Sequence, residues 1–123
     1  MEFASRRLAD VVLAIPSGRI DHSSAEDFRS ALEPLLDDCA AGRDSVVLDF
    51  SGVEYISSVG LRVLMVAAKQ VRPKKGVMVI AGMQPVVKEI FEISRFSFVF
   101  EAFDSVQAAL AKVSPAALAA YRK

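Results

Sequence analysis

Residues 45–81 read SVVLDFSGVEYISSVGLRVLMVAAKQVRPKKGVMVIA, and this stretch decides the fold class. The run at its start, residues 45–50, is mostly apolar and contains two valines, which is typical of a strand buried on both faces. Residues 57–72 have the apolar pattern of a helix, and residues 77–81 form a second buried strand after a turn that contains proline and glycine. We therefore expect strand, helix and strand in succession, with a loop at residues 51–58.

The segment upstream extends the same alternation. We expect strands at residues 2–7 and 11–15, the second closing at a Pro-Ser-Gly turn. A helix should follow, because Ser23 and Glu26 have the spacing of a capping box, in which a hydroxyl and a carboxylate take free amides of the first turn. Pro34 then predicts a kink or an early end of this helix.

The segment downstream continues with two more helices and a short strand. Pro85 stands at the first position of a helix, where its missing N–H does no harm. Residues 98–100 are expected to be the last strand, followed by a helix that ends near Val113. We predict a single domain over residues 1–113 and a C-terminal tail or short extra helix at residues 114–123.

Alternating strands and helices of this kind predict an α/β fold with a mixed, mostly parallel sheet of four or five strands and about four helices. Loops that follow parallel strands gather beyond the carboxyl ends of the strands, where ligands and partners bind. We expect three such loops to meet at one edge, namely residues 18–23, 51–58 and 82–84. A functional site should lie at that edge.

Composition excludes several functional classes. The chain has 123 residues, 53% of them hydrophobic, and 15 basic and 15 acidic side chains that cancel, which excludes disorder and gives no electrostatic footprint for nucleic acid or an anionic membrane. Its one cysteine, Cys39, excludes a disulfide framework and a multi-cysteine metal site. The apolar run at residues 61–68 is far shorter than the ~20 residues of a membrane span, and residues 1–7 lack the apolar stretch of a secretory signal. We expect a cytoplasmic domain without a metal or cofactor.

Ser57, Ser58 and Gly60 stand where a loop becomes a helix. Ser57 is expected to be the N-cap, its hydroxyl accepting a hydrogen bond from an amide two or three residues further on. Ser58 then falls in the first turn, where free amides and the helix dipole would favour a phosphoryl group on its hydroxyl. Gly60 lies inside the helix at a cost of about 0.5–1 kcal/mol relative to alanine, which indicates a close approach to its backbone.

Four motifs occur in order along the chain: GRID at residues 18–21, LDFSGV at 48–53, YISSVGL at 55–61 and QPVVKEIF at 84–91. With these motifs the sequence resembles a STAS domain from about residue 3 to residue 113. Within the STAS family it is most similar to the anti-sigma factor antagonists.

The resemblance implies regulation by partner switching. The unmodified protein would bind an anti-sigma factor that is also a serine kinase of the ATPase-fold type, and the sigma factor would be released. The kinase would then phosphorylate the serine two residues before the helix glycine, which is Ser58 here, and the complex would separate. A metal-dependent serine phosphatase would restore the binding form. Many members have aspartate before the modified serine, where this chain has Ser57, so Ser57 is the alternative site.

The partner-binding surface is expected to include Asp21, Ser57, Ser58, Gly60, Arg62 and Met83. The family often has an acid where Asp21 stands, although aspartate is equally typical of a turn. Arg62 lies one turn after Ser58 and could bind a carboxylate of the partner. Met83 falls in the third loop, where an exposed methionine would suit an adaptable contact.

Other functions fit the sequence less well. A catalytic triad of Ser58, His22 and Asp21 is disfavoured, because sequence neighbours rarely reach the His–Asp geometry and no nucleophile-elbow motif occurs. We therefore expect no enzyme activity. A phosphoacceptor receiver domain would use Asp49, but the acid pair and the lysine that it also needs are missing. A STAS domain that binds a small ligand or scaffolds a complex without being phosphorylated is the alternative within the fold.

Overall fold

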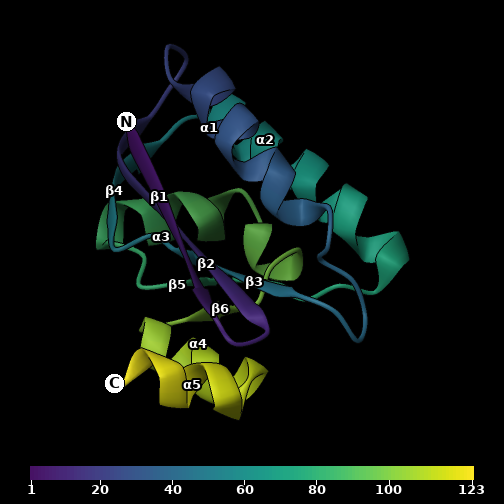
Figure 1. Cartoon of the computed structure of the whole chain (residues 1–123). Helices are drawn as coiled ribbons and strands as arrows, with labels where there is room; N and C mark the ends of the chain where they lie inside the picture. The colour runs from purple at the N-terminus through teal and green to yellow at the C-terminus, as the bar shows by residue number, and fades with distance from the viewer.

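A six-stranded sheet forms the centre of the computed structural model, which describes all residues from 1 to 123 (Figure 1). Its strands are β1 (Glu2–Leu8), β2 (Val11–Ile20), β3 (Ser45–Asp49), β4 (Gly52–Ile56), β5 (Met78–Ala81) and β6 (Ala102–Phe103). They run in the order β1-β2-β3-β5-β6, and β4 pairs with the second half of β2. Only β1 is antiparallel to its neighbour. The predicted α/β fold class is confirmed, with six strands instead of four or five.

Five α-helices cover the sheet: α1 (Ala25–Leu32), α2 (Ser58–Val71), α3 (Pro85–Ile93), α4 (Val106–Val113) and α5 (Pro115–Tyr121). The first three lie on one face of the sheet and the last two on the other (Figure 1). Val46 and Leu48 of β3 are buried against α1–α3, and Val47 between them is buried against α4 and α5. This alternation is what a sheet covered on both faces requires. None of the helices combines the length and the apolar composition that crossing a membrane requires.

The strand β2 is longer than the sequence predicts, because it continues through the Pro-Ser-Gly sequence to Ile20. The turn expected at this point is wrong. Pro16 is tolerated because β2 pairs with β3 up to Ala14 and with β4 from Ser17, so the residue that lacks an N–H lies between the two pairings. Gly18 has φ +89° and marks an irregularity in the pairing with β4.

Residues 51–58 are not the predicted loop, because Gly52–Ile56 form β4 along the edge of β2. A strand of five residues rises about 17 Å, so β4 carries the start of α2 that far from the end of β3. The three loops that were expected to meet at one edge of the sheet therefore do not all meet there. Residues 82–84 contact Ser51 at the start of β4, whereas α2 begins at its end.

The first helix, α1, differs from the sequence prediction at its start and agrees with it at its end. Its N-cap residue is Ser24 and not the predicted Ser23, and the Ser24 hydroxyl donates to the Arg19 carbonyl at 2.7 Å instead of capping the helix. The helix ends at Leu32, just before Pro34, and a short 3₁₀ helix follows, as the proline predicts.

The strand predicted at residues 98–100 is wrong. A 3₁₀ helix, Phe96–Phe98, occupies this part of the chain, and the last strand is β6. Phe96 and Phe100 are both buried in the core, whereas Phe98 between them is 84% exposed. In a strand all three would share one face, so this pattern suits a helical turn.

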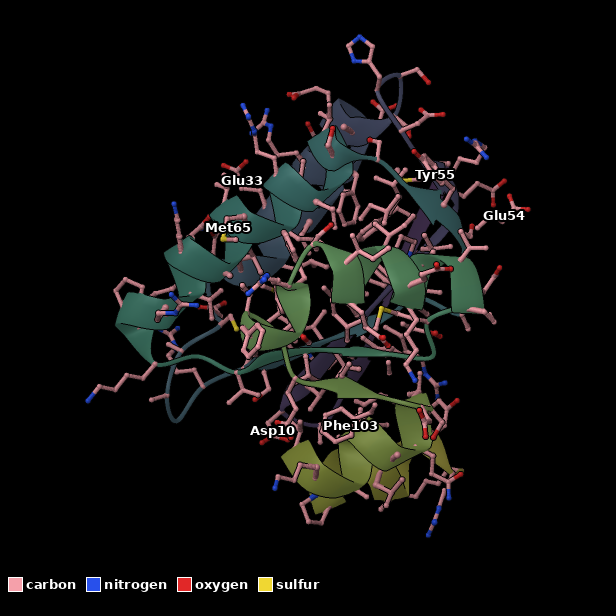
Figure 2. All side chains as sticks on the ribbon, turned by 180° about the vertical axis from the view of Figure 1, so that it is seen from behind. Asp10, Glu33, Glu54, Tyr55, Met65 and Phe103 are labelled. Atoms are coloured by element: carbon pink, nitrogen blue, oxygen red, sulfur yellow. The ribbon has the colours of Figure 1, made fainter.

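Residues 114–123 fold against the sheet. The buried Ser114 hydroxyl donates a hydrogen bond of 2.6 Å to Asp10 Oδ1 and accepts one of 3.1 Å from the Ala117 amide. These bonds cap α5 and fasten it to the β1–β2 turn, where Asp10 lies beside the C-terminal helices (Figure 2). Ala117 of α5 is buried in the core that α4 and α5 form with this face of the sheet.

Candidate functional site

The helix α2 begins where the ends of β2 and β4 meet. The Ser57 amide donates to the Ile20 carbonyl at 2.8 Å, and Ser57 Oγ accepts a hydrogen bond from the Gly60 amide at 3.3 Å. The predicted N-cap role of Ser57 is confirmed, and its side chain is half-buried. Ser58 is the first residue of the helix, and it is exposed, with a hydroxyl that makes no hydrogen bond within the protein.

Gly60 lets the first turn of α2 rest directly on the sheet. A Cβ at this position would lie 2.8 Å from Ile20 Cγ2, 2.8 Å from Ile56 Cγ1 and 3.2 Å from the Ile20 carbonyl oxygen. Only glycine avoids contacts this short. The predicted close approach is confirmed, and its source is the protein's own sheet. Because Gly60 is buried, it positions its neighbours and adds little exposed surface of its own.

Asp21 lies in the loop between β2 and α1, beside the start of α2. Its carboxylate accepts hydrogen bonds from the Ser23 hydroxyl at 2.8 Å and the Ser23 amide at 3.1 Å, and it lies 3.7 Å from the Arg19 guanidinium. The hydrogen bonds from Ser23, the hydroxyl's above all, lower the pKa of Asp21 below its ordinary value. Asp21 is thus a charged turn residue whose side chain keeps 34% of its surface exposed.

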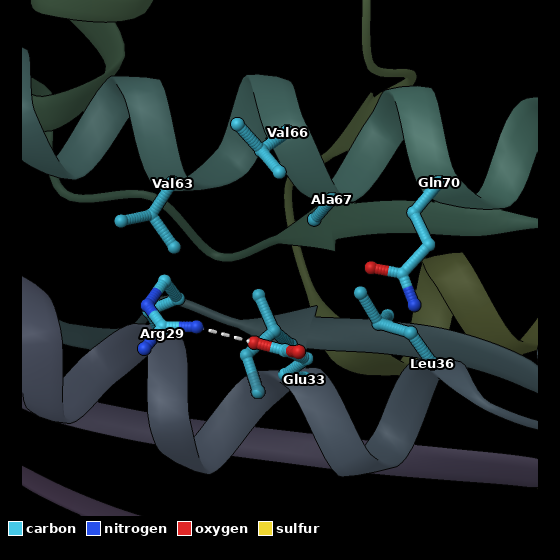
Figure 3. A pocket seen from close by; sticks show the side chains of 8 residues that line it. Arg29, Glu33, Leu36, Val63, Val66, Ala67 and Gln70 are labelled. Carbon is cyan, nitrogen blue, oxygen red and sulfur yellow. Dashed lines mark hydrogen bonds and ion pairs between the residues drawn. The ribbon is translucent and has the colours of Figure 1, made fainter.

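A groove between α1 and α2 opens next to Ser58. Two adjoining cavities of about 330 Å3 and about 200 Å3 form it, and both are lined by Arg29, Val63 and Val66. Figure 3 shows the smaller of the two, which we call the inner cavity. Side chains of α2 point across it toward Arg29, Glu33 and Leu36. We call this feature the α1–α2 groove.

The larger of the two, which we call the outer cavity, borders the predicted site around Ser58. His22, Val59 and Arg62 line it, and all three are exposed. Val59 follows Ser58 directly, and Arg62 lies one helical turn further along α2. The structure therefore brings Asp21, His22, Ser58 and Arg62 to one end of the α1–α2 pair.

Met83 lies apart from this end. It is half-buried, packs against the core and lines a small cavity with Phe103 at the connection between β5 and α3. The Gln84 amide group anchors this connection by donating to the Ser51 carbonyl at 2.9 Å, at the start of β4. The length of β4, about 17 Å, separates that point from the start of α2.

The geometry also bears on the two catalytic alternatives. Asp21 bonds Ser23 and not His22, so no His–Asp pair is present to activate a serine. Asp49 accepts hydrogen bonds from the Ser51 hydroxyl at 2.7 Å and the Ser51 amide at 3.0 Å, a local capping role. No group of three or more His, Cys, Asp or Glu side chains is placed to hold a metal ion, as a receiver domain requires.

Comparison with known proteins decides the family. Residues 4–109 match the sequence profile described as the STAS domain. The chain belongs to the STAS domain family. BtrV of Bordetella bronchiseptica, a protein named as an anti-sigma factor antagonist, is 35% identical to this STAS domain over 111 residues, which cover 90% of this chain and 93% of BtrV.

Solved structures show the same fold. An anti-sigma factor antagonist from Mycobacterium paratuberculosis matches this STAS domain with a TM-score of 0.81 and 21% identity over 91% of this chain and 92% of that one. The anti-sigma factor antagonist SpoIIAA matches in its unphosphorylated form with a TM-score of 0.73 and 16% identity, over 91% and 96% of the two chains. The phosphorylated form of SpoIIAA matches with a TM-score of 0.67 and 15% identity, over 91% and 99%.

The α1–α2 groove of this STAS domain was not predicted from the sequence. Val59, Val63 and Val66 have the spacing i, i+4 and i+7 of one helix face. A different face of α2, which includes Leu61 and Leu64, already fills the core. A second apolar face on a helix that has one buried face is the signal that could have indicated the groove.

Proposed function

We propose that this STAS domain is an anti-sigma factor antagonist that works by partner switching and is phosphorylated on Ser58. The observation that carries the proposal is the Ser58 hydroxyl, exposed at the first position of α2 and free of protein partners. At a helix N-terminus the free amides and the helix dipole stabilise an added phosphate. Asp21 and Arg62 flank this hydroxyl and form the rest of the contact surface.

Ser57 is the poorer substrate of the two serines. Its side chain is half-buried and its hydroxyl oxygen already accepts a hydrogen bond from the Gly60 amide, so it is less accessible to a kinase than the Ser58 hydroxyl. Modification of Ser58 costs no bond within the protein.

The partner is a serine kinase of the ATPase-fold type that also acts as an anti-sigma factor. The unmodified domain binds the kinase, and the kinase transfers the γ-phosphoryl group of ATP to Ser58 Oγ, with loss of the hydroxyl proton and release of ADP. The phosphate adds about −1.5 to −2 charges. Placing that charge in a docked surface costs several kcal/mol if acidic groups face it, and each ~1.4 kcal/mol weakens binding tenfold.

A metal-dependent serine phosphatase restores the binding form by hydrolysing the phosphoserine. In this cycle the domain supplies a surface and a substrate hydroxyl, and the kinase and the phosphatase supply the catalysis. The relatives support this proposal, because BtrV carries the name of an anti-sigma factor antagonist and SpoIIAA exists in unphosphorylated and phosphorylated forms.

The test is capture from a lysate of the source organism on immobilised wild type, Ser58→Asp and Ser97→Asp. Ser97 is an exposed serine in the 3₁₀ helix after α3, so its variant controls for added charge. We expect wild type and Ser97→Asp to retain a serine kinase that Ser58→Asp does not retain. Equal retention by all three would contradict switching at Ser58 and would favour a scaffold that needs no phosphorylation.

A further inference from the structure

The α1–α2 groove exposes an apolar stripe along α2, formed by Val59, Val63 and Val66. Val66 leaves 56% of its surface exposed and Val59 leaves 41%, and the half-buried Val63 between them lines both cavities. Across the groove, Leu32 and Leu36 line the inner cavity together with the charged side chains of Arg29 and Glu33 (Figure 3). The stripe spans residues 59–66, an axial rise of about 10 Å, which matches two turns of a helix laid against it.

Two arginines line the groove, and only one of them has an acidic partner within the protein. Arg29 is held between Glu26 and Glu33, with 2.6 Å from its Nη1 to the Glu33 carboxylate. Arg62 forms no ion pair and is exposed at the lip of the outer cavity. The groove therefore offers one cation that is free to pair with a carboxylate of a partner.

We propose that the α1–α2 groove binds an amphipathic helix of the kinase partner, with an acidic side chain of that helix paired to Arg62, and that a phosphate on Ser58 expels the helix by taking Arg62 for itself. This inference rests on the proposed function and extends it to a named groove and a named cation. Apolar residues of the bound helix, spaced at i and i+3 or i+4, cover the valine stripe.

The positions of Ser58 and Arg62 allow the phosphate to act in this way. Residues four apart lie on the same face of a helix, with Cβ atoms roughly 5–6 Å apart. A phosphoserine at position 58 thus reaches the Arg62 guanidinium within the same helix, and a charge-assisted pair between phosphate and arginine is among the strong hydrogen bonds of proteins. The partner's carboxylate then faces a neutralised arginine and a dianion beside it. The affinity falls although the fold of the domain stays the same.

The first measurement is the dissociation constant of the kinase captured by wild type, determined by titration calorimetry with matched variants. Val66→Glu introduces a charge into the stripe, and Val86→Glu is its control, since Val86 is 55% exposed on α3 outside the groove. Arg62→Gln removes the cation, and Lys69→Gln makes the same change further along α2, outside both cavities. We expect Val66→Glu and Arg62→Gln to weaken binding at least tenfold, about 1.4 kcal/mol, and the controls to stay within twofold of wild type.

The second measurement needs no partner. With phosphoserine incorporated at position 58, the phosphorus NMR titration should show a second phosphate pKa lower in wild type than in Arg62→Gln by about half a unit or more, because a nearby cation favours the dianion. Lys69→Gln should titrate like wild type. Identical curves for wild type and Arg62→Gln would overturn the capture of Arg62 by the phosphate.

The possible results distinguish a failure of the proposed function from a failure of the groove proposal alone. If wild type captures no kinase, the proposed function fails and the occupant of the groove fails with it. If wild type captures a kinase that binds Val66→Glu and Arg62→Gln as tightly as wild type, the groove proposal alone is overturned. A concentration-dependent dimer in sedimentation that Val66→Glu abolishes would also overturn it, because the occupant would then be a second copy of this chain.

Discussion

The amide of Ser57 donates a 2.8 Å hydrogen bond to the carbonyl of Ile20, the last residue of β2. This contact joins the start of α2 to the sheet and places the loop that contains Asp21 beside Ser58. The hydroxyl that we propose as the modified group therefore stands on a rigid strand end and a helix, which fixes the geometry that a kinase must recognise.

Replacement of Ser57 should reveal its capping role. We expect Ser57→Ala to lower the free energy of unfolding by about 1 kcal/mol, because the Gly60 amide loses its acceptor. Ser58→Ala should change it by less than about 0.5 kcal/mol, as exposed residues without such features usually do. Urea unfolding followed by circular dichroism measures both. If the two alanine variants were equally stable, the capping assignment would be wrong.

A side chain at position 60 should disturb the packing of α2 on the sheet. Alanine would gain about 0.5–1 kcal/mol of helix propensity, but its Cβ would meet Ile20 and Ile56 at 2.8 Å, and overpacking of this kind costs about 1–3 kcal/mol. We expect Gly60→Ala to be destabilised by roughly 1 kcal/mol and Gly60→Val by more. A thermal melt checks the sign, and a higher melting temperature for Gly60→Ala would show that the contact relaxes freely.

The sequence predicts the architecture well where periodicity is strong. The alternation of strands and helices, the cap at Ser57, the close approach at Gly60 and the early end of the first helix at Pro34 all follow from local chemistry. The course of β2 beyond Pro16 does not, because that proline is allowed only by the change of partner from β3 to β4, which is a tertiary fact.

The candidate site is predicted only in part for a related reason. Treating residues 51–58 as a loop brings Met83 close to Ser58, whereas β4 keeps them apart. The pairing of β4 with β2 could not be read from a short segment that contains Gly52 and Glu54 among its apolar residues. The α1–α2 groove depends on which residues of two distant helices face each other, and a single sequence does not specify that.

The ion pair between Arg7 and Asp44 should stabilise the fold in a pH-dependent way. Arg7 donates hydrogen bonds of 3.0 Å and 2.8 Å to the two Asp44 oxygens, and the hydrogen bonding from Arg7 lowers the pKa of that carboxyl. Because the pKa is lowered on folding, the stabilisation is fully present above the ordinary value of about 3.9 and disappears as the pH falls through the lowered value.

Asp44→Asn tests this dependence. We expect the variant to be less stable than wild type at pH 7 by no more than about 1 kcal/mol, because exposed pairs contribute about 0.2–1 kcal/mol. The difference should shrink as the pH falls below about 4. Urea unfolding at a series of pH values measures it, and a difference that stays constant into acid would contradict the assignment.

The contact between Ser114 and Asp10 should make α5 part of the folded domain. Ser114→Ala removes the cap of α5 and the 2.6 Å hydrogen bond to Asp10, so we expect a loss of about 1.5–3 kcal/mol. Ser105→Ala removes only the exposed cap of α4 and should cost about 1 kcal/mol. A double-mutant cycle with Asp10→Ala isolates the bond. A coupling energy of zero would mean that α5 is held by its apolar contacts alone.

Mass spectrometry can locate the phosphorylated residue directly. Wild type, Ser58→Ala and Ser57→Ala should each be incubated with the captured kinase and ATP and then analysed by peptide mass spectrometry. We predict a single phosphate on Ser58 in wild type and in Ser57→Ala, and none in Ser58→Ala. Modification of Ser57 alone, or continued phosphorylation of Ser58→Ala, would contradict the assignment of Ser58 as the modified residue.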